Sequence, residues 1–322
     1  MSDSPVRLSP ARLTTRQFVL LAQLDRDRSV LRAADAVGMS QPAASKLLRE
    51  VEKTLGVPLF ERHARGVEPT PFGEIVMRHA HSVLAEIRRA QEEVEALKRG
   101  ERFKVAIGSV LSPATDLLPM AISALEREHP RMQVGVEIDT SRPLVAKLLQ
   151  GRLDIVIGRV LDAEHAALLR VEPLSEEPHH LIARAGHPLA QRRRLRVADL
   201  VEHTWVMPAA ESILRERVEA MFLQRGLRLP ARIVETSSLP LITNLLRHAD
   251  TLVALPEEVV RPYCEAGMLV VLPIDLQVRM DSFGLITRRE HALSRAATQA
   301  LNALSAAAAA VYRARQGAVA AR

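Results

Sequence analysis

The sequence predicts an α/β protein made of an all-α head, one long helix and a larger domain of alternating strands and helices. Three observations support this prediction. Residues 12–71 show short, capped helical patterns, residues 72–99 repeat apolar side chains at helical spacing, and residues 102–322 alternate short apolar runs with helical stretches. A length of 322 residues also allows two or three domains.

The composition excludes several classes of protein. Hydrophobic residues at 48% and charged residues at 25% are typical of a globular protein, and aromatic residues at 3% argue against stacking on single-stranded nucleic acid. Cys264 is the single cysteine, so we expect no intramolecular disulfide and no cysteine-rich metal site. The N-terminus lacks the apolar core of a secretory signal, and no apolar run is long enough to cross a membrane. We therefore expect a cytoplasmic protein without membrane partners.

The head, residues 12–71, is expected to hold a helix-turn-helix. Ser29 can cap one short helix that Gly38 ends, and Ser40 can cap a second helix that Gly56 closes. So short a link forces the two helices to cross steeply, as in a helix-turn-helix. The following prolines and glycine, in the stretch VPLFERHARGVEPT, predict a wing hairpin.

The second helix of this motif carries a face of hydrogen-bond donors. In a helix-turn-helix this helix enters the major groove, where Gln41 suits adenine and Lys46 or Arg49 suits guanine or phosphate. Hydroxyl groups such as those of Ser40 and Ser45 suit phosphate oxygens. The alternative is an ordinary solvated helix face. An excess of 11 Lys+Arg over 8 Asp+Glu in residues 1–71 gives weak support to a polyanion partner, double-stranded DNA.

The long helix, residues 72–99, predicts dimerisation. Its apolar residues follow spacings of four and three: Val76, Ala80, Val83, Ile87, Ala90, Val94 and Leu97. Such a seam, sustained for three heptads with charged flanks, is typical of a coiled coil. The alternative is a helix that packs on its own head.

The third segment predicts two small sheets. Its expected strands are residues 104–109, 133–138, 153–158, 179–183, 204–207, 232–235, 251–255, 269–272 and 283–287. We expect lobe I at about 102–177 and 282–322, lobe II at about 178–281, and a hinge in the crossing strands 178–184 and 281–287. Small polar residues end several strands, where α/β proteins bind ligands. The expected effector residues are Ser109, Thr140, Ser141, Arg159, Pro208, Ala209, Ser237 and Ser238. Ordinary turn residues are the alternative.

Residues 29–74 closely resemble the DNA-binding domain of LysR-type transcriptional regulators. The shared pattern comprises Ala33-Ala34, Ser40-Gln41-Pro42-Ala43-Ala44-Ser45, Leu55-Gly56, Leu59-Phe60-Glu61-Arg62 and Thr70-Pro71-Phe72-Gly73. The resemblance implies a winged helix-turn-helix, a dimerising linker helix and a two-lobed effector-binding domain like type 2 periplasmic binding proteins. It also implies a homotetramer on bent promoter DNA, with RNA polymerase as a candidate partner. The expected DNA contacts are Ser40, Gln41, Pro42, Ser45, Lys46, Arg49, Arg62, Arg65 and Thr70.

The stretches FERHARGVEPT and SRPLVAKLLQGRLDIVIGRVLD resemble the subgroup that includes galactose-binding-protein regulators, which implies a sugar or small organic acid as effector. One difference from the family argues against inferring the effector from this resemblance: His248-Ala249-Asp250-Thr251 stands where many members have a glycine-rich turn. Two other classes remain open. A solute-binding transport component needs an export signal, and an enzyme needs a nucleophile, metal or acid–base constellation, so we expect no catalytic residue, metal or cofactor. The basic run at 191–196 is either a nucleic-acid patch or a solvated loop.

Overall fold

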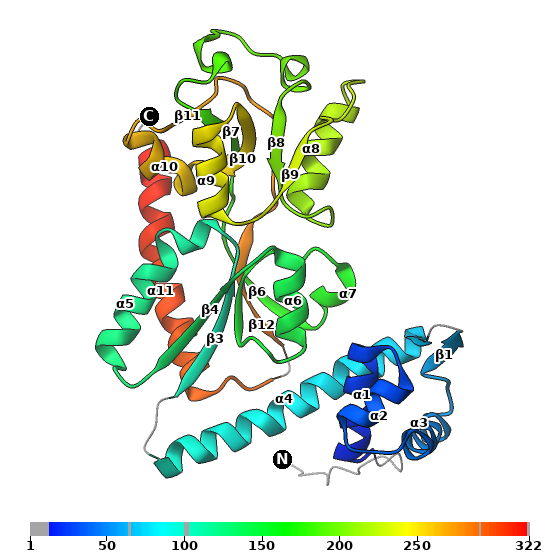
Figure 1. Cartoon of the computed structure of the whole chain (residues 1–322). Helices are drawn as coiled ribbons and strands as arrows, with labels where there is room; N and C mark the ends of the chain where they lie inside the picture. Colours follow the sequence, from blue (N-terminus) through cyan, green and yellow to red (C-terminus); the bar gives the residue numbers. More distant parts are fainter. Residues whose placement is uncertain (1–12, 64–65, 100–102, 290, 321–322) are drawn as a thin grey trace. The chain divides into compact units, whose positions relative to one another are not determined.

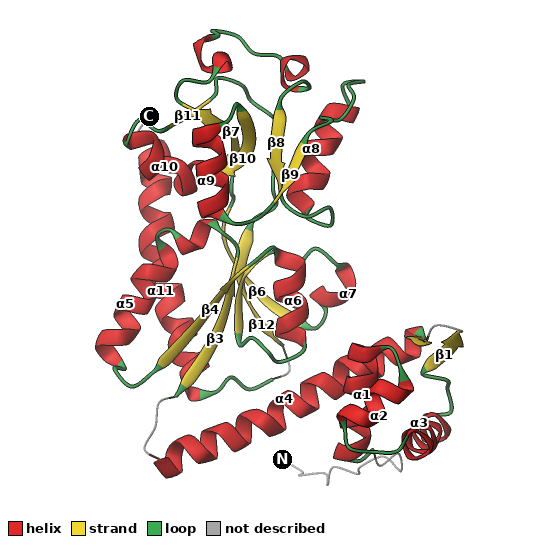
Figure 2. Ribbon diagram, in the orientation of Figure 1, coloured by secondary structure: helices red, strands yellow, loops and turns green. Residues whose placement is uncertain are grey.

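The computed structural model describes residues 13–63, 66–99, 103–289 and 291–320. The chain divides into two compact units, an N-terminal unit of the head and the long helix and a larger C-terminal domain. Figure 1 labels their elements, and Figure 2 separates the helices from the strands. Among the described residues, none of the helices combines the length and the apolar character that a membrane span requires.

The head contains three helices, a hairpin and the start of the long helix. These are α1 (Thr15–Asp27), α2 (Val30–Ala36), α3 (Gln41–Leu55), β1 (Phe60–His63), β2 (Gly66–Pro69) and α4 (Pro71–Arg99). The predicted caps of the helix-turn-helix are confirmed. The hydroxyls of Ser29 and Ser40 accept the N–H groups of Arg32 and Ala43, and Gly56 ends α3 at φ 75°. Each such N-cap stabilises its helix by about 1 kcal/mol.

One apolar core holds these elements together. Ala33 and Ala34 of α2 are fully buried, and their small side chains let α2 approach its neighbours closely. The carboxylate of Glu52 in α3 accepts the N–H of Leu59 at 2.9 Å, which fixes the start of the hairpin against the helix. A side chain at Gly73 would meet the carbonyl oxygen of Leu59, so α4 can begin beside the hairpin because that residue is glycine.

The apolar seam of α4 divides into two parts. Ala80 is fully buried in the core of the head, and Val76 packs against that core. Further along, Val83 and Ile87 are each 38% exposed and Val94 is 50% exposed. The first part thus packs on the head of the same chain, as in the alternative to dimerisation given for this helix. The second part presents apolar side chains to solvent.

The C-terminal domain has two lobes, each built on a five-stranded sheet. The sheet of lobe I has the order β4-β3-β5-β12-β6. Its strands are β3 (Lys104–Ser109), β4 (Gln133–Ile138), β5 (Ile155–Gly158), β6 (Leu169–Ser175) and β12 (Phe283–Arg288). Strands β3, β4 and β5 run parallel, whereas β12 pairs antiparallel with β5 and β6. Its helices are α5 (Leu117–Glu128), α6 (Ser141–Leu149), α7 (Ala163–Ala166) and α11 (Arg295–Ala320).

Lobe II has the sheet order β11-β7-β10-β8-β9. Its strands are β7 (His179–Arg184), β8 (Thr204–Met207), β9 (Ile233–Glu235), β10 (Thr251–Pro256) and β11 (Leu269–Val271). The helices are α8 (Ile213–Leu223), α9 (Leu239–His248) and α10 (Glu257–Glu265). Trp205 and Phe222 lie at the centre of the core, with their rings in an edge-to-face contact 5.6 Å apart. Buried aromatic pairs of this kind add about 1 kcal/mol beyond their area.

The chain passes between the lobes twice, and the structure places both passages next to the predicted hinge strands rather than in them. β7 lies wholly in the sheet of lobe II and β12 wholly in the sheet of lobe I. The connecting residues are therefore 176–178 and 272–282. The predicted hinge therefore differs from the observed connections by a few residues. The reason is that an apolar run identifies a strand but does not show which sheet the strand joins.

Candidate functional site

The exposed face of α3 is the first candidate site. Gln41, Pro42, Lys46 and Arg49 are all exposed. Helical spacing places these residues on neighbouring turns, so their polar groups face solvent together. Lys46 lies 4.0 Å from Glu50, an exposed contact too weak to hold the lysine in place. The face can therefore donate hydrogen bonds to an external partner.

Two of the expected DNA contacts have side chains engaged inside the head. The Ser45 side chain is buried, and its hydroxyl accepts from the Gln41 side-chain amide at 3.1 Å. The Thr70 hydroxyl donates to the carbonyl of Pro58 at 2.8 Å and accepts the N–H of Gly73 at 3.0 Å. Thr70 thus caps α4 and fixes the end of the hairpin. Arg62 is exposed on β1, and Arg65 lies outside the described residues.

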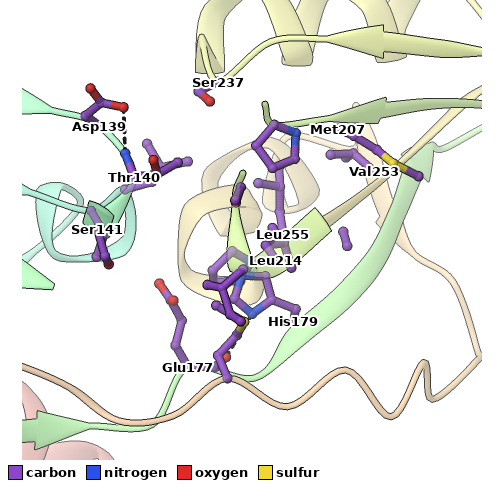
Figure 3. A pocket seen from close by; sticks show the side chains of 18 of the residues that line it. Asp139, Thr140, Ser141, Glu177, His179, Met207, Leu214, Ser237, Val253 and Leu255 are labelled. Carbon is purple, nitrogen blue, oxygen red and sulfur yellow. Dashed lines mark hydrogen bonds between the residues drawn. The ribbon is translucent and has the colours of Figure 1, made fainter. Parts of the chain in front are cut away.

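The second candidate site is a cavity of about 130 Å³ between the lobes of the C-terminal domain. Figure 3 shows Thr140 and Ser141 on one side, with Met207 and Val253 on the other. Most of the wall is apolar and comes from both lobes: Val110, Leu111, Ile138, Val206, Met207, Ile213, Leu214, Ile242, Val253, Leu255 and Met280. A largely apolar wall with a few polar groups is typical of a small-molecule site.

Three helices begin at this cavity. Thr140 and Ser141 open α6, Ser212 is the N-cap of α8, and Ser237 precedes Ser238, the N-cap of α9. Helix N-termini carry unpaired N–H groups and a partial positive charge, which favour a bound anion. One such N–H is occupied by the protein itself, because the Asp139 carboxylate accepts from the N–H of Thr140 at 2.7 Å.

A buried ion pair forms part of the cavity wall. The Arg159 guanidinium lies 2.6 Å from the Glu177 carboxylate, and the two side chains are 4% and 6% exposed. Arg159 Nε also donates to the carbonyl of Asp281 at 2.6 Å, and its backbone N–H donates to the hydroxyl of Ser141 at 3.1 Å. Arg159 follows β5, whereas Glu177 and Asp281 belong to the two connections between the lobes. The arginine therefore ties both connections to lobe I.

His179 lines the cavity beside this ion pair. Its Nδ1 lies 2.9 Å from the carbonyl oxygen of Glu177, and a carbonyl can only accept, so Nδ1 carries the hydrogen. Burial lowers the pKa of His179, and the nearby Glu177 opposes that shift only in part. The ring is therefore neutral at neutral pH, with Nε2 as an acceptor.

The structure brings together five of the eight expected effector residues. Those lining the cavity are Thr140, Ser141, Arg159, Pro208 and Ser237. Ser109 is fully buried, with its hydroxyl donating to the carbonyl of Val110, and neither Ala209 nor Ser238 lines the cavity.

Asp139, Glu177 and His179 also line it, and sequence reasoning missed all three. The motif Glu177-Pro178-His179 lies at a lobe crossing, and a polar crossing segment was the available signal.

Comparisons with known proteins agree with this architecture. A model described as LysR substrate binding domain matches residues 98–309, and one described as bacterial regulatory helix-turn-helix protein, lysR family, matches residues 15–74. The transcriptional regulator GbpR of Azospirillum brasilense is 37% identical over 298 residues, which are 92% of this chain and 87% of that protein.

Two solved structures show the same fold. ArgP from Mycobacterium tuberculosis superposes with a TM-score of 0.64 at 17% identity and covers 92% of this chain and 98% of its own. Full-length CbnR complexed with its target DNA has a TM-score of 0.55 at 18% identity and covers 92% and 100%. From the two matched domains and the identity to GbpR, we conclude that this chain belongs to the LysR family of DNA-binding transcriptional regulators, with an effector-binding C-terminal domain.

Proposed function

We propose that the effector of this regulator is a small organic acid that binds between lobes I and II. The cavity between the lobes carries the proposal. Its volume of about 130 Å³ is well below the range of drug-sized ligand sites, so it suits a small molecule. Its apolar wall suits a short hydrocarbon body, and the three helix starts suit a carboxylate. A sugar, the other candidate expected from the sequence, would bring many hydroxyl groups against that apolar wall.

Thermal denaturation of the full chain with a panel of small carboxylates, their methyl esters and neutral monosaccharides tests this assignment. A ligand that binds only the native state stabilises it, by about 2.7 kcal/mol at a concentration a hundredfold above its Kd, and so raises the melting temperature. We expect stabilisation by a carboxylate, none by its ester, and loss of the effect in Thr140→Val. Ser238→Ala is the matched control because Ser238 does not line the cavity. Stabilisation by sugars alone would overturn the assignment.

We further propose that α3 reads promoter DNA and that two copies of the chain join through α4. The exposed donors of α3 support the first part, and the exposed apolar side chains of α4 support the second. A symmetric dimer presents two copies of α3, which suits a pseudo-palindromic operator. Pairing of dimers into a tetramer on bent DNA and contact with RNA polymerase belong to the same proposal. So do DNA contacts by Ser40, Gln41, Pro42, Lys46, Arg49, Arg62 and Arg65, whereas Ser45 and Thr70 would position α3 and the hairpin.

Substitution of Arg49 tests the role of α3. Arg49→Ala should weaken binding to a duplex selected from a random library more than binding to a mixed-sequence duplex, by about 1–3 kcal/mol of discrimination. Lys53→Ala removes the same charge one turn further along the same exposed helix and serves as the control. Arg62→Ala should weaken both complexes similarly. Equal losses for Arg49→Ala on the two duplexes would assign Arg49 to phosphate.

A further inference from the structure

Eight arginines lie in two segments of lobe II that belong to neither of the two candidate sites. The segments are residues 184–203, between β7 and β8, and residues 224–232, between α8 and β9. The arginines are Arg184, Arg192, Arg193, Arg194, Arg196, Arg225, Arg228 and Arg232, and all but the half-buried Arg184 are exposed. We call this set the arginine surface.

The fold brings both segments to one end of lobe II. β7 begins at the cavity residue His179 and ends at Arg184, whereas β8 begins after the first segment and ends at the cavity residue Met207. The 184–203 connection therefore lies at the end of the sheet away from the cavity (Figure 1). β9 runs parallel to β8, so the 224–232 segment that enters it lies at the same end.

Contacts between the segments confirm their proximity. Arg228 pairs with Glu202, and Arg232 Nη2 donates to the carbonyl of Glu202 at 2.5 Å. Burial is the main reason why the pKa of His203 is lowered, and Asp250 opposes that shift. The positive charges of Arg232 and Arg192, one from each segment, lower the pKa further. Arg192 and Arg232 thus act on the same histidine from the two segments.

This end of the lobe carries a large surplus of positive charge. Against eight arginines, the two segments contain two acidic residues, Asp199 and Glu202. Asp250, just before β10, pairs with Arg184 at 2.7 Å. The surplus of six charges equals the net charge of +6 of the whole chain, so the rest of the chain is neutral in sum. Asp199 lies between Arg192 and Arg196, at 3.4 and 3.9 Å. Within the described residues, no ion pair or hydrogen bond is observed for the side chains of Arg193 and Arg194.

We propose that the arginine surface binds the phosphate backbone of double-stranded DNA, as a second contact in addition to α3. Guanidinium groups match phosphate geometry with paired hydrogen bonds. Neither segment contains Phe, Tyr or Trp, which argues against single-stranded nucleic acid and against the aromatic anchors of a protein interface. Phosphate contacts carry no base information, so this surface adds affinity for any sequence.

A salt titration of DNA binding by the full chain tests the proposal, with a mixed-sequence duplex as the probe and fluorescence anisotropy as the readout. Each phosphate contact contributes about 0.9 to the slope of log K against log salt. The double variant R193Q/R194Q should lower the slope by about 1.8. Its affinity should then fall about tenfold less than that of the wild type between about 50 and 200 mM salt. The matched control R127Q/R131Q removes two exposed arginines from lobe I and should leave the slope unchanged.

Two further outcomes separate this proposal from the role of α3. In a K46A/R49A background, residual binding to the mixed-sequence duplex should depend on Arg193 and Arg194. If the same background also binds the selected duplex without loss, the role of α3 is contradicted and the arginine surface stays supported. The arginine surface is overturned if R193Q/R194Q has the slope of the wild type. A loss of transcription with unchanged DNA binding would assign the surface to an acidic protein and would also overturn it.

Discussion

At the scale of single residues, the ion pair of Arg159 and Glu177 couples the cavity to both connections between the lobes. The arginine also lies over the ring of Phe283, 5.6 Å from its centroid, at the start of β12. Burying two charges is costly, and their hydrogen bonds offset that cost only while both partners are present. Each partner is therefore needed for the stability of the other.

Glu177→Ala should destabilise the C-terminal domain by about 3–5 kcal/mol, because it leaves the guanidinium buried without its counter-charge. Chemical denaturation of the full chain, followed by circular dichroism, measures the change. Glu202→Ala is the control, since Glu202 and its partner Arg228 are 76% and 71% exposed and such pairs contribute about 1 kcal/mol or less. A similar loss of unfolding free energy in the two variants would show that the buried pair stabilises the domain no more than the exposed pair.

His187 predicts a loss of stability of lobe II in acid. The residue is fully buried, its Nδ1 accepts the N–H of Leu189, and its ring lies 5.0 Å from that of His203. Burial, and then the neighbouring histidine, lowers the pKa of His187 below its ordinary 6.5. The unfolded chain then binds a proton that the folded domain does not, so stability is full above about pH 6.5 and falls as the pH drops below it.

Urea denaturation followed by the fluorescence of the single tryptophan, Trp205, reports on lobe II directly because this residue lies in its core. Between about pH 7 and pH 5 the midpoint should fall for the wild type. His187→Asn keeps an acceptor for Leu189 but cannot be protonated, so its midpoint should change less. An equally steep fall in the variant would assign the effect to other groups.

At the scale of elements, α4 serves two purposes along its length. Its first turns complete the core of the head through Met77 and Ala80, and a contact of 2.9 Å between His81 and Asp25 ties it to α1. The later seam residues Val83, Ile87 and Val94 stay exposed. A strict heptad pattern predicts a helix with an apolar stripe, but only packing shows which part of the stripe remains available to a second copy.

Ile87→Asp and Val94→Asp should each weaken self-association. Burying an apolar side chain of this size contributes about 1.5–3 kcal/mol, so the dissociation constant of the dimer should rise tenfold or more. Sedimentation velocity measures the change, with Arg88→Asp as the control on the neighbouring helix face. An unchanged sedimentation coefficient in both seam variants would place the dimer interface elsewhere.

Among the strands that the structure describes, the sequence did not predict β6. Its residues, Leu169–Ser175, are mostly exposed and it forms the edge of the sheet of lobe I. Charged residues and a proline interrupt the apolar residues of β6, so it lacks the apolar run that identified the other strands. β6 is defined by its pairing with β12, a partner that lies far along the chain.

At the scale of the whole molecule, the proposed effector contacts both lobes of one domain. A ligand changes a conformational equilibrium only through different affinities for the two states. A cavity lined from both lobes, with Arg159 joining their connections, can meet that requirement.

The stabilising carboxylate should therefore change the bend angle of the bound promoter DNA, measured by circular permutation gel shift. Thr140→Val should remove this response while leaving DNA binding without ligand unchanged. If the ligand stabilises the protein but the bend angle and the footprint stay constant, the proposed switch is wrong.

The sequence alone determined the local structure of the head. The caps of α2 and α3 and the left-handed Gly56 depend on neighbouring residues, so their pattern predicts them directly. Most strands were also predicted, because a buried strand shows as a short apolar run.

Only the tertiary structure decided the composition of the cavity and the surfaces. Arg159 and Asp281 are 122 residues apart, and they meet because both lobe connections pass the end of β5. Likewise, Thr70 turns inward because the carbonyl of Pro58, twelve residues earlier, accepts from its hydroxyl. Such contacts depend on how distant segments pack, and no local pattern encodes that packing.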